Sequence, residues 1–247
     1  MYFLKNLDTV VMKKYSLLIL IFLVNYFGYA QFNDCKEYGF KGKIKKVTTY
    51  NYSDLKKENK KWQIENDELI SKWEFIVNED QNFEEIKIIL FDKDSISMIY
   101  KSTYQFSNGK RSSYKRVDIN EKVVETGKYQ WLNEFTYKTN SDFFDDYSIE
   151  SVNILNNNYR DFINESSMYS LENGEKILIY TEGYENFFDE KGFIKKSKTN
   201  DLENGSLILL NEIHEIDNFG NITKYAIKKE NGELEKLVIR TFEYLNN

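Results

Sequence analysis

The sequence holds few of the side chains on which hydrolytic or metal-dependent chemistry is built. Histidine occurs once, at His214, and cysteine once, at Cys35. A Ser-His-Asp or Cys-His site would depend on His214, which lies in an alternating segment and which we expect to face solvent on a strand. No Gly-x-Ser-x-Gly, Walker or His-Glu-x-x-His motif occurs. One histidine and one cysteine are too few for a zinc site, and a single cysteine forms no intramolecular disulfide.

Carboxylates are the remaining metal-binding candidates. Two acidic groups offer the oxygen ligands that calcium prefers. They are Asp92 with Asp94, and Asp142 with Asp145 and Asp146. Neither group is followed by the glycine and distal glutamate of an EF-hand loop. Acidic turns that keep the surface soluble are the simpler interpretation, so we predict no metal and no cofactor.

Two further features leave room for carbohydrate chemistry. A glycoside hydrolase needs only two well-placed carboxylates, and the 40 Asp and Glu of the chain provide many pairs without selecting one. Trp62, Trp73 and Trp131 could stack on sugars, although packing in the core is the simpler role for such rings. We name no catalytic residue and expect the chain not to be an enzyme.

Residues 12–30 have the form of a signal peptide. Lys13 and Lys14 precede an apolar run from Leu17 to Val24, and Gly28 and Ala30 are small residues spaced as at a cleavage site. We predict cleavage after Ala30, which leaves 31–247 as a single domain. We interpret residues 1–11 as the product of a start codon assigned too early.

Two alternatives to simple export remain open. A membrane anchor is one, although the apolar run is about half of the ~20 residues that a spanning helix needs. Lipidation of Cys35 is the other, but the residues before it, Phe32-Asn33-Asp34, are bulky and polar. We therefore expect an inert thiol near a frayed N-terminus and no stable membrane span after cleavage.

Recurring turns divide the mature chain. Glu-Asn-Gly is spelled three times, ending at Gly174, Gly205 and Gly232, and Asn-Gly favours tight hairpin turns because both residues accept positive φ. A second turn type recurs at 188–194 and 216–222, and 77–83 is a copy with Gln81 at the glycine position. The predicted structural turn residues are Asp67, Gly109, Gly174, Gly192, Gly205, Gly220 and Gly232.

The spacing of these turns predicts a β-hairpin repeat. The number of residues from one turn to the next alternates between a larger and a smaller value. Two successive intervals add up to about 27 residues, as from Gly205 to Gly232. Segments such as 96–106 alternate apolar and polar residues, the period of a strand with one buried face. We predict an all-β fold, an antiparallel meander of about ten or eleven strands built from ~27-residue hairpins. The expected strand pairs are 68–77 with 83–91, 96–106 with 110–118, and 221–229 with both 206–216 and 233–244.

Residues 138–170 break this rhythm. They hold an acidic cluster and an asparagine triplet, and several apolar residues fall near helical spacing. Asparagine and serine side chains compete with the backbone for hydrogen bonds, which disfavours a stable helix. We expect an irregular excursion with at most a short helix.

The Asp-x-x-Gly-x-Ile turns at 189–194 and 217–222 resemble YD repeats of the Rhs type. The segments 39–47 and 239–244 look like those of small exported proteins of unassigned function from Gram-negative bacteria, which carry degenerate YD-like hairpins. The resemblance implies a β-hairpin fold and export, and no activity.

Three functions fit these observations. The first is an exported, non-catalytic binding or scaffold protein of YD-like hairpins, periplasmic or secreted, whose partner is an unknown protein, glycan or lipid. The second is an open, curved sheet that carries a lipid or other apolar ligand. The third is a carboxylate-dependent glycoside hydrolase. Nucleic acid is excluded as a partner, because the net charge is −6 and the basic residues are interleaved with acidic ones.

Overall fold

The computed structural model describes residues 32–53, 55–58, 61–64, 68–92, 95–144, 146–172, 175–201 and 205–245. The predicted signal peptide with its cleavage site after Ala30, the upstream residues 1–11, and the turn residues Asp67 and Gly174 lie outside these ranges. Residues Asn33–Asn247 form one compact unit. Among the described residues, no helix is long and apolar enough to cross a membrane.

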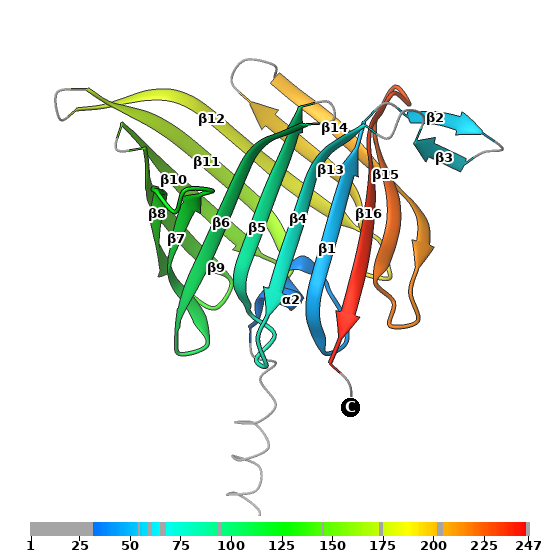
Figure 1. Ribbon diagram of the computed structural model, residues 1–247, viewed down its shortest axis with the longest axis horizontal. Coiled ribbons are helices and arrows are strands. Elements are labelled where there is room, and N and C mark those ends of the chain that lie inside the picture. Colours follow the sequence, from blue (N-terminus) through cyan, green and yellow to red (C-terminus); the bar gives the residue numbers. More distant parts are fainter. Residues whose placement is uncertain are drawn as a thin grey trace, which may run out of the picture. The chain divides into compact units, whose positions relative to one another are not determined.

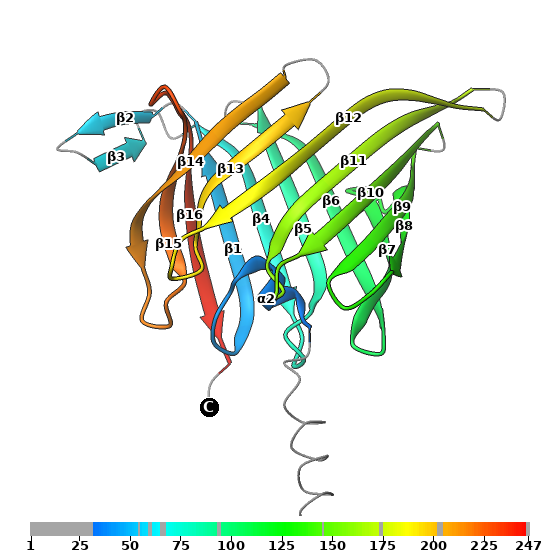
Figure 2. The same cartoon turned by 180° about the vertical axis from the view of Figure 1, so that it is seen from behind.

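Fourteen strands form a closed antiparallel barrel (Figures 1 and 2). Each strand pairs with its neighbours in the chain, and the first strand closes the barrel between the last strand and β4. The strands are β1 (Ile44–Tyr52), β4 (Leu69–Val77), β5 (Phe83–Asp92), β6 (Ser95–Ser107), β7 (Lys110–Asp118), β8 (Val123–Trp131), β9 (Thr136–Phe143), β10 (Tyr147–Leu155), β11 (Asp161–Glu172), β12 (Glu175–Phe188), β13 (Ile194–Asp201), β14 (Gly205–Ile216), β15 (Ile222–Lys229) and β16 (Leu234–Tyr244).

Two short elements stand apart from the barrel wall. Strands β2 (Leu55–Glu58) and β3 (Lys61–Ile64) pair with each other in a separate two-stranded sheet, as a hairpin between β1 and β4. Helix α2 (Asp34–Tyr38) precedes β1 and lies between the front and back walls at one end of the barrel, which we call the α2 end (Figures 1 and 2).

The prediction of a meander of ten or eleven strands was wrong, because the sheet has fourteen strands and closes on itself. The expected local pairs are nevertheless confirmed, including β4 with β5, β6 with β7, and β15 with both β14 and β16. Turn spacing predicts which strands are neighbours in sequence. It carries no information on the pairing of β1 with β16, which join residues almost 200 positions apart.

Residues 138–170 form no excursion, because they are part of strands β9, β10 and β11. Here the strand period was hidden, since polar residues stand on both faces. Ser151 and Ser166 are hydrogen-bonded across the β10–β11 pair at 2.9 Å, and Asn164 donates to Asn153 at 2.8 Å. These cross-strand bonds satisfy the side chains that seemed to compete with regular structure.

The repeated turns belong to the two ends of the barrel. Four turns at the α2 end share one construction, in which an Asp or Asn side chain accepts backbone N–H bonds and the fourth residue has positive φ. Those fourth residues are Gln81, Tyr159, Gly192 and Gly220. Gly205 and Gly232, at the opposite end, and Gly109, at the α2 end, also have positive φ. A unit of about 27 residues is therefore one strand that runs from one end of the barrel to the other, together with the antiparallel strand that returns.

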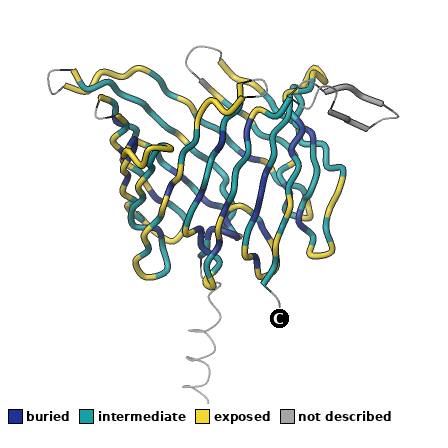
Figure 3. Tube along the Cα trace, viewed as in Figure 1, coloured by how far each residue is buried: buried dark blue, intermediate teal, exposed yellow. Residues whose placement is uncertain are grey.

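The lumen near α2 is packed with apolar and aromatic side chains. Buried residues gather on α2 and on β1, β4 and β5 (Figure 3). Their cluster contains Cys35, Phe40, Ile44, Val47, Phe75, Val77, Phe83 and Ile86. A row of tyrosines continues across β6 to β9, with centroid distances of 5.9, 5.9 and 5.6 Å between Tyr104, Tyr114, Tyr129 and Tyr137.

The outer wall carries ion pairs between neighbouring strands. Lys101 lies 2.7 Å from Glu85, and Lys46 lies 2.9 Å from Glu74. These residues alternate with lumen-facing ones, so they point outward. The wall thus differs from the uninterrupted apolar band that faces lipid in outer-membrane barrels.

Candidate functional site

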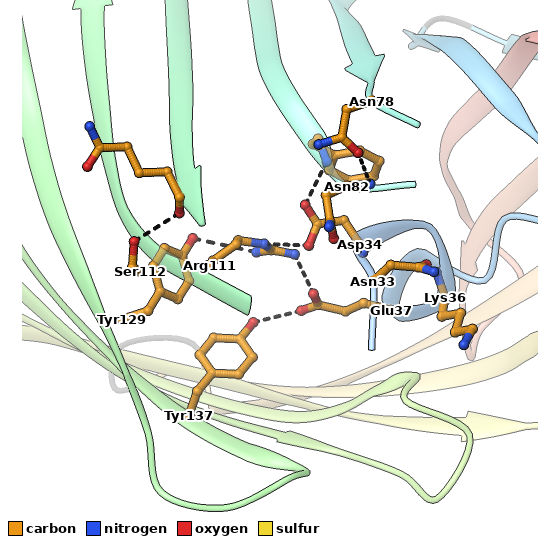
Figure 4. A network of polar contacts seen from close by, with 12 residues as sticks. Asn33, Asp34, Lys36, Glu37, Asn78, Asn82, Arg111, Ser112, Tyr129 and Tyr137 are labelled. Carbon is orange, nitrogen blue, oxygen red and sulfur yellow. Dashed lines mark hydrogen bonds and ion pairs between the residues drawn. The ribbon is translucent and has the colours of Figure 1, made fainter. Parts of the chain in front are cut away.

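A buried ion network fixes helix α2 to the barrel wall (Figure 4). Arg111 on β7 donates from Nε to Asp34 Oδ1 at 2.7 Å and from Nη2 to Glu37 Oε2. Tyr137 on β9 donates its hydroxyl to the other Glu37 oxygen at 2.7 Å. Asp34 also accepts the backbone N–H of Phe83 at 2.7 Å. The helix is therefore held by β5, β7 and β9 together.

The network places two carboxylates on one guanidinium. Asp34 and Glu37 are 0% and 4% exposed, and Arg111 is 8% exposed. Burial raises the pKa of Glu37 to about 7, against the attraction of Arg111 and with the further repulsion of Asp34. Glu37 is thus a group in the lumen whose charge responds to pH near neutrality.

Cys35 lies in the same helix, with its thiol inside the apolar cluster. It is 3% exposed, and burial raises the pKa of the thiol to about 12. The expectation of a frayed N-terminus around it was wrong, because α2 is anchored. The inertness that we expected of the thiol follows here from burial.

Anchoring continues along the segment that leads from α2 into β1. Asn221, in the β14–β15 turn, accepts from Lys41 N at 2.7 Å and donates to Lys41 O at 2.9 Å. Gln81, in the β4–β5 turn, accepts from Ile44 N at 2.8 Å. The turns of the α2 end therefore hold the N-terminal segment in the mouth of the barrel.

A cavity of about 490 Å³ remains between this segment and the lumen side of β11 to β16. Its lining combines aromatic rings with polar and basic groups, the mixture that is typical of sites for small molecules. The aromatic members are Tyr38, Phe40, Tyr184, Phe193 and Tyr225, and the charged members are Glu37, Arg160, Asp161, Lys236 and Arg240.

The two arginines of the cavity are held in place by neutral partners. Arg160 donates from Nη1 to Gly192 O at 2.7 Å, and its guanidinium lies against the α-carbon of Gly39. Arg240 donates from Nη2 to the Tyr225 hydroxyl at 2.9 Å and lies 5.0 Å from that ring centroid. Both guanidinium groups are therefore oriented without an ion pair to a described carboxylate.

The residues singled out from the sequence lie elsewhere. His214 is on β14, with Nε2 3.8 Å from Glu212 Oε1 on the outward-facing side. Trp73 packs against the apolar cluster, and Trp131 packs on Tyr137 at 4.7 Å. The side chain of Trp62 is outside the described part of the chain. The sequence search did not find Arg111, Arg160, Arg240 or the α2 carboxylates.

The acidic groups proposed for calcium do not form a site among the described residues. Asp94 and Asp145 lie outside the described ranges. Within the described ranges, no three His, Cys, Asp or Glu side chains are grouped so that they could hold a metal ion.

Barrel closure also corrects the predicted functions. An open sheet carrying an apolar ligand and a scaffold of YD-like hairpins were both wrong, because the hairpins form one closed barrel with a lumen. The glycoside hydrolase has no support either, since the lumenal pair Asp34 and Glu37 is bound to Arg111. The likeness of individual turns to YD repeats stays a prediction.

The prediction that no stable membrane span remains after signal cleavage was wrong. It weighed only apolar helices, whereas an antiparallel barrel pairs all its strands and is an architecture that can cross a bilayer. The expected partner, an unknown protein, glycan or lipid, belonged to the scaffold of YD-like hairpins and falls with it.

No known protein family matches the sequence, and no curated protein sequence does. Solved structures with a similar fold include a porin-like protein from Bacteroides vulgatus ATCC 8482, which is 10% identical over 82% of this chain and 99% of that one, with a TM-score of 0.47. A porin-like protein from Bacteroides uniformis ATCC 8492 is 9% identical over 81% and 96%, with a TM-score of 0.42. At these values the likeness carries no argument about what the present chain binds.

Proposed function

We propose that the chain is an exported protein of the bacterial envelope whose closed barrel binds a small organic molecule in its lumen. The predicted signal peptide supports export. The observation that carries the binding function is the cavity of about 490 Å³, which lies within the range of known small-molecule sites.

The walls of this cavity are well fixed. One side is α2 with the segment that follows it, which Arg111, Gln81 and Asn221 hold by buried or half-buried hydrogen bonds. The other side consists of six paired strands. A site built on such rigid elements loses little conformational freedom when a ligand binds.

Binding without catalysis is the simpler assignment for this lumen. Catalysis by carboxylates would need a group that is free to exchange protons with a substrate. Glu37 has both oxygens engaged, and Asp161 accepts the hydroxyl of Tyr184 at Oδ2, while its Oδ1 is buried. We therefore assign these groups to the architecture of the site.

The test is a fluorescence titration of the mature protein with two naphthalene probes of similar shape, N-phenyl-1-naphthylamine and 8-anilino-1-naphthalenesulfonate. We expect saturable binding of at least one probe at one site per chain. The variant Leu209→Trp should abolish it, because Leu209 lines the cavity and the larger ring would fill it.

Ile208→Trp is the matched control. Ile208 is the neighbour of Leu209 on β14 and faces the opposite side of the wall, where it pairs with Lys198. This variant should bind like the parent protein. Absence of binding by both probes, or equal loss in both variants, would contradict a lumen site.

A further inference from the structure

The sequence contains four arginines among 34 Lys and Arg, and all four face the lumen. Two of them are neutralised there. Arg111 is paired with Asp34 and Glu37, and Arg116 lies 2.6 Å from Glu125. The other two, Arg160 and Arg240, line the cavity and form no ion pair with a described carboxylate.

Each of these two arginines also keeps an unused donor inside the protein. The Nε atoms of Arg160 and Arg240 are buried and have no hydrogen-bond partner among the described residues. A buried polar group without a partner is costly, and one on a charged side chain is more so. Both guanidinium groups are therefore held inside the protein with hydrogen-bonding capacity that no described carboxylate uses.

The charge balance of the cavity points the same way. Lys236 lines the same cavity, so three cationic side chains stand there with Asp161 and the Arg111-bound Glu37. Burial and the nearby Arg240 lower the pKa of Arg160, and burial lowers the pKa of Lys236. Burial also raises the pKa of Asp161. Burial thus disfavours the charged form of each group, and the three cations outnumber the two carboxylates of the lining.

The rest of the cavity defines the body of the ligand. Beside the arginines lie the rings of Phe40, Phe193 and Tyr225 and the side chains of Leu209 and Ile222. Such a lining favours flat or apolar groups through burial and ring stacking. A ligand that fits both parts has one anionic end and an apolar or aromatic body.

We propose that Arg160 and Arg240 form an oxyanion site, at which the lumen binds an amphipathic organic acid through its carboxylate or phosphate group. This inference rests on the proposed function and names the chemical class of its ligand. Guanidinium groups suit such ligands because their N–H bonds match the two oxygens of a carboxylate or phosphate.

The two naphthalene probes separate this inference from lumen binding in general, because only one of them carries a sulfonate. We expect the parent protein to bind 8-anilino-1-naphthalenesulfonate at least about tenfold more tightly than the uncharged N-phenyl-1-naphthylamine. Competition by 1-naphthoate and by 1-naphthyl phosphate then distinguishes a carboxylate from a phosphate ligand, since both have the same ring system.

Arg160→Gln and Arg240→Gln should each lower the affinity for the sulfonate probe by about tenfold. The affinity for the uncharged probe should change by less than about twofold. Lys198→Gln is the control, because it removes a cation from the outward face of β13, opposite the lumen-facing Ser197 and Thr199. It should leave both affinities unchanged.

Equal affinity of the parent protein for the two probes would overturn the oxyanion site while lumen binding stands. Binding of neither probe would overturn both proposals. Should a glutamine variant fail to fold, Arg240→Lys keeps the charge and removes the planar donor pair. That variant should lower the affinity for the sulfonate probe and leave the affinity for the uncharged probe unchanged. Unchanged affinity for both would contradict the role of Arg240.

Discussion

At the scale of single residues, Glu37 gives the lumen a dependence on pH. Its pKa is about 7 in the folded barrel and near 4.5 when unfolded. The folded state therefore holds the proton more tightly, and this contribution to stability is complete below pH 4.5. It is lost as the pH rises from there to 7. The loss is on the order of 1–3 kcal/mol.

Thermal unfolding of the parent protein and of Glu37→Gln, followed at intervals from pH 4.5 to 7.5, measures this contribution. Glutamine keeps an acceptor oxygen for Arg111, its NH2 group can donate to the Tyr137 hydroxyl, and it does not titrate. The parent should lose stability across the interval, and the variant should show a flatter curve. Identical slopes for the two proteins would contradict a raised pKa at Glu37.

Gly39 is the residue that allows Arg160 to reach the cavity. Its φ is +72°, and a Cβ placed on it would lie 2.1 Å from Arg160 Cζ. We predict that Gly39→Ala displaces the Arg160 guanidinium and lowers the affinity for the sulfonate probe as much as Arg160→Gln does. Backbone strain should add about 1–2 kcal/mol of destabilisation. Circular dichroism melting and probe titration measure the two effects separately.

Little of this site could be predicted from the sequence. Searches for catalytic motifs favour His, Cys and clustered acids, whereas His214 and Cys35 do not line the cavity. The scarcity of arginine beside abundant lysine was the available indication. Lysine suffices on an exposed surface, whereas a buried pairing with a planar oxyanion or carboxylate favours arginine.

At the scale of elements, the turns offer a test of backbone conformation. Glu121 in the β7–β8 turn has φ +62°, in a turn built like the one that contains Gly192. Glu121→Gly should stabilise the protein by about 1 kcal/mol, because glycine adopts this conformation without steric cost. Chemical denaturation measures the difference.

Gly192→Ala is the reverse experiment. A Cβ there would meet nothing within 4 Å, so any destabilisation comes from its φ of +79° alone. Equal stability of this variant and the parent would show that the turn tolerates either residue and would remove the basis of both expectations.

Local elements were the part of the fold that the sequence predicted best. Hairpins close on neighbouring residues, so the spelling of a turn and the period of two suffice to place β4 to β7 and β14 to β16. These two patterns failed to predict β9 to β11, because the lumen side of these strands is polar and their two faces look alike. A strand is recognisable from its pattern only where its two faces meet different surroundings.

At the scale of the whole molecule, closure by β1 and β16 is the feature that sequence patterns did not contain. Hydrogen bonding between adjacent strands is the same in an open meander and in a closed barrel. What decides closure here is the filling of the lumen by α2 and its aromatic neighbours, which cover the inner face of the sheet.

A cross-link tests this closure directly. Thr48 on β1 and Thr241 on β16 are direct partners on the outer side of the wall, and such pairs lie within the reach of a disulfide. We expect the double variant Thr48→Cys, Thr241→Cys to form the bond on mild oxidation, which thiol titration and a shift on non-reducing gels would detect. The buried Cys35 should not compete, since burial raises the pKa of its thiol to about 12.

The matched control combines Thr48→Cys with Thr126→Cys. Thr126 is also on the outer side, but it lies on β8, which is five strands away from β1 by the shorter way around the barrel. This pair should stay reduced inside one chain under the same conditions. If both pairs remained reduced, β1 and β16 would not be neighbours, and the lumen on which the binding site depends would be open to solvent along one side.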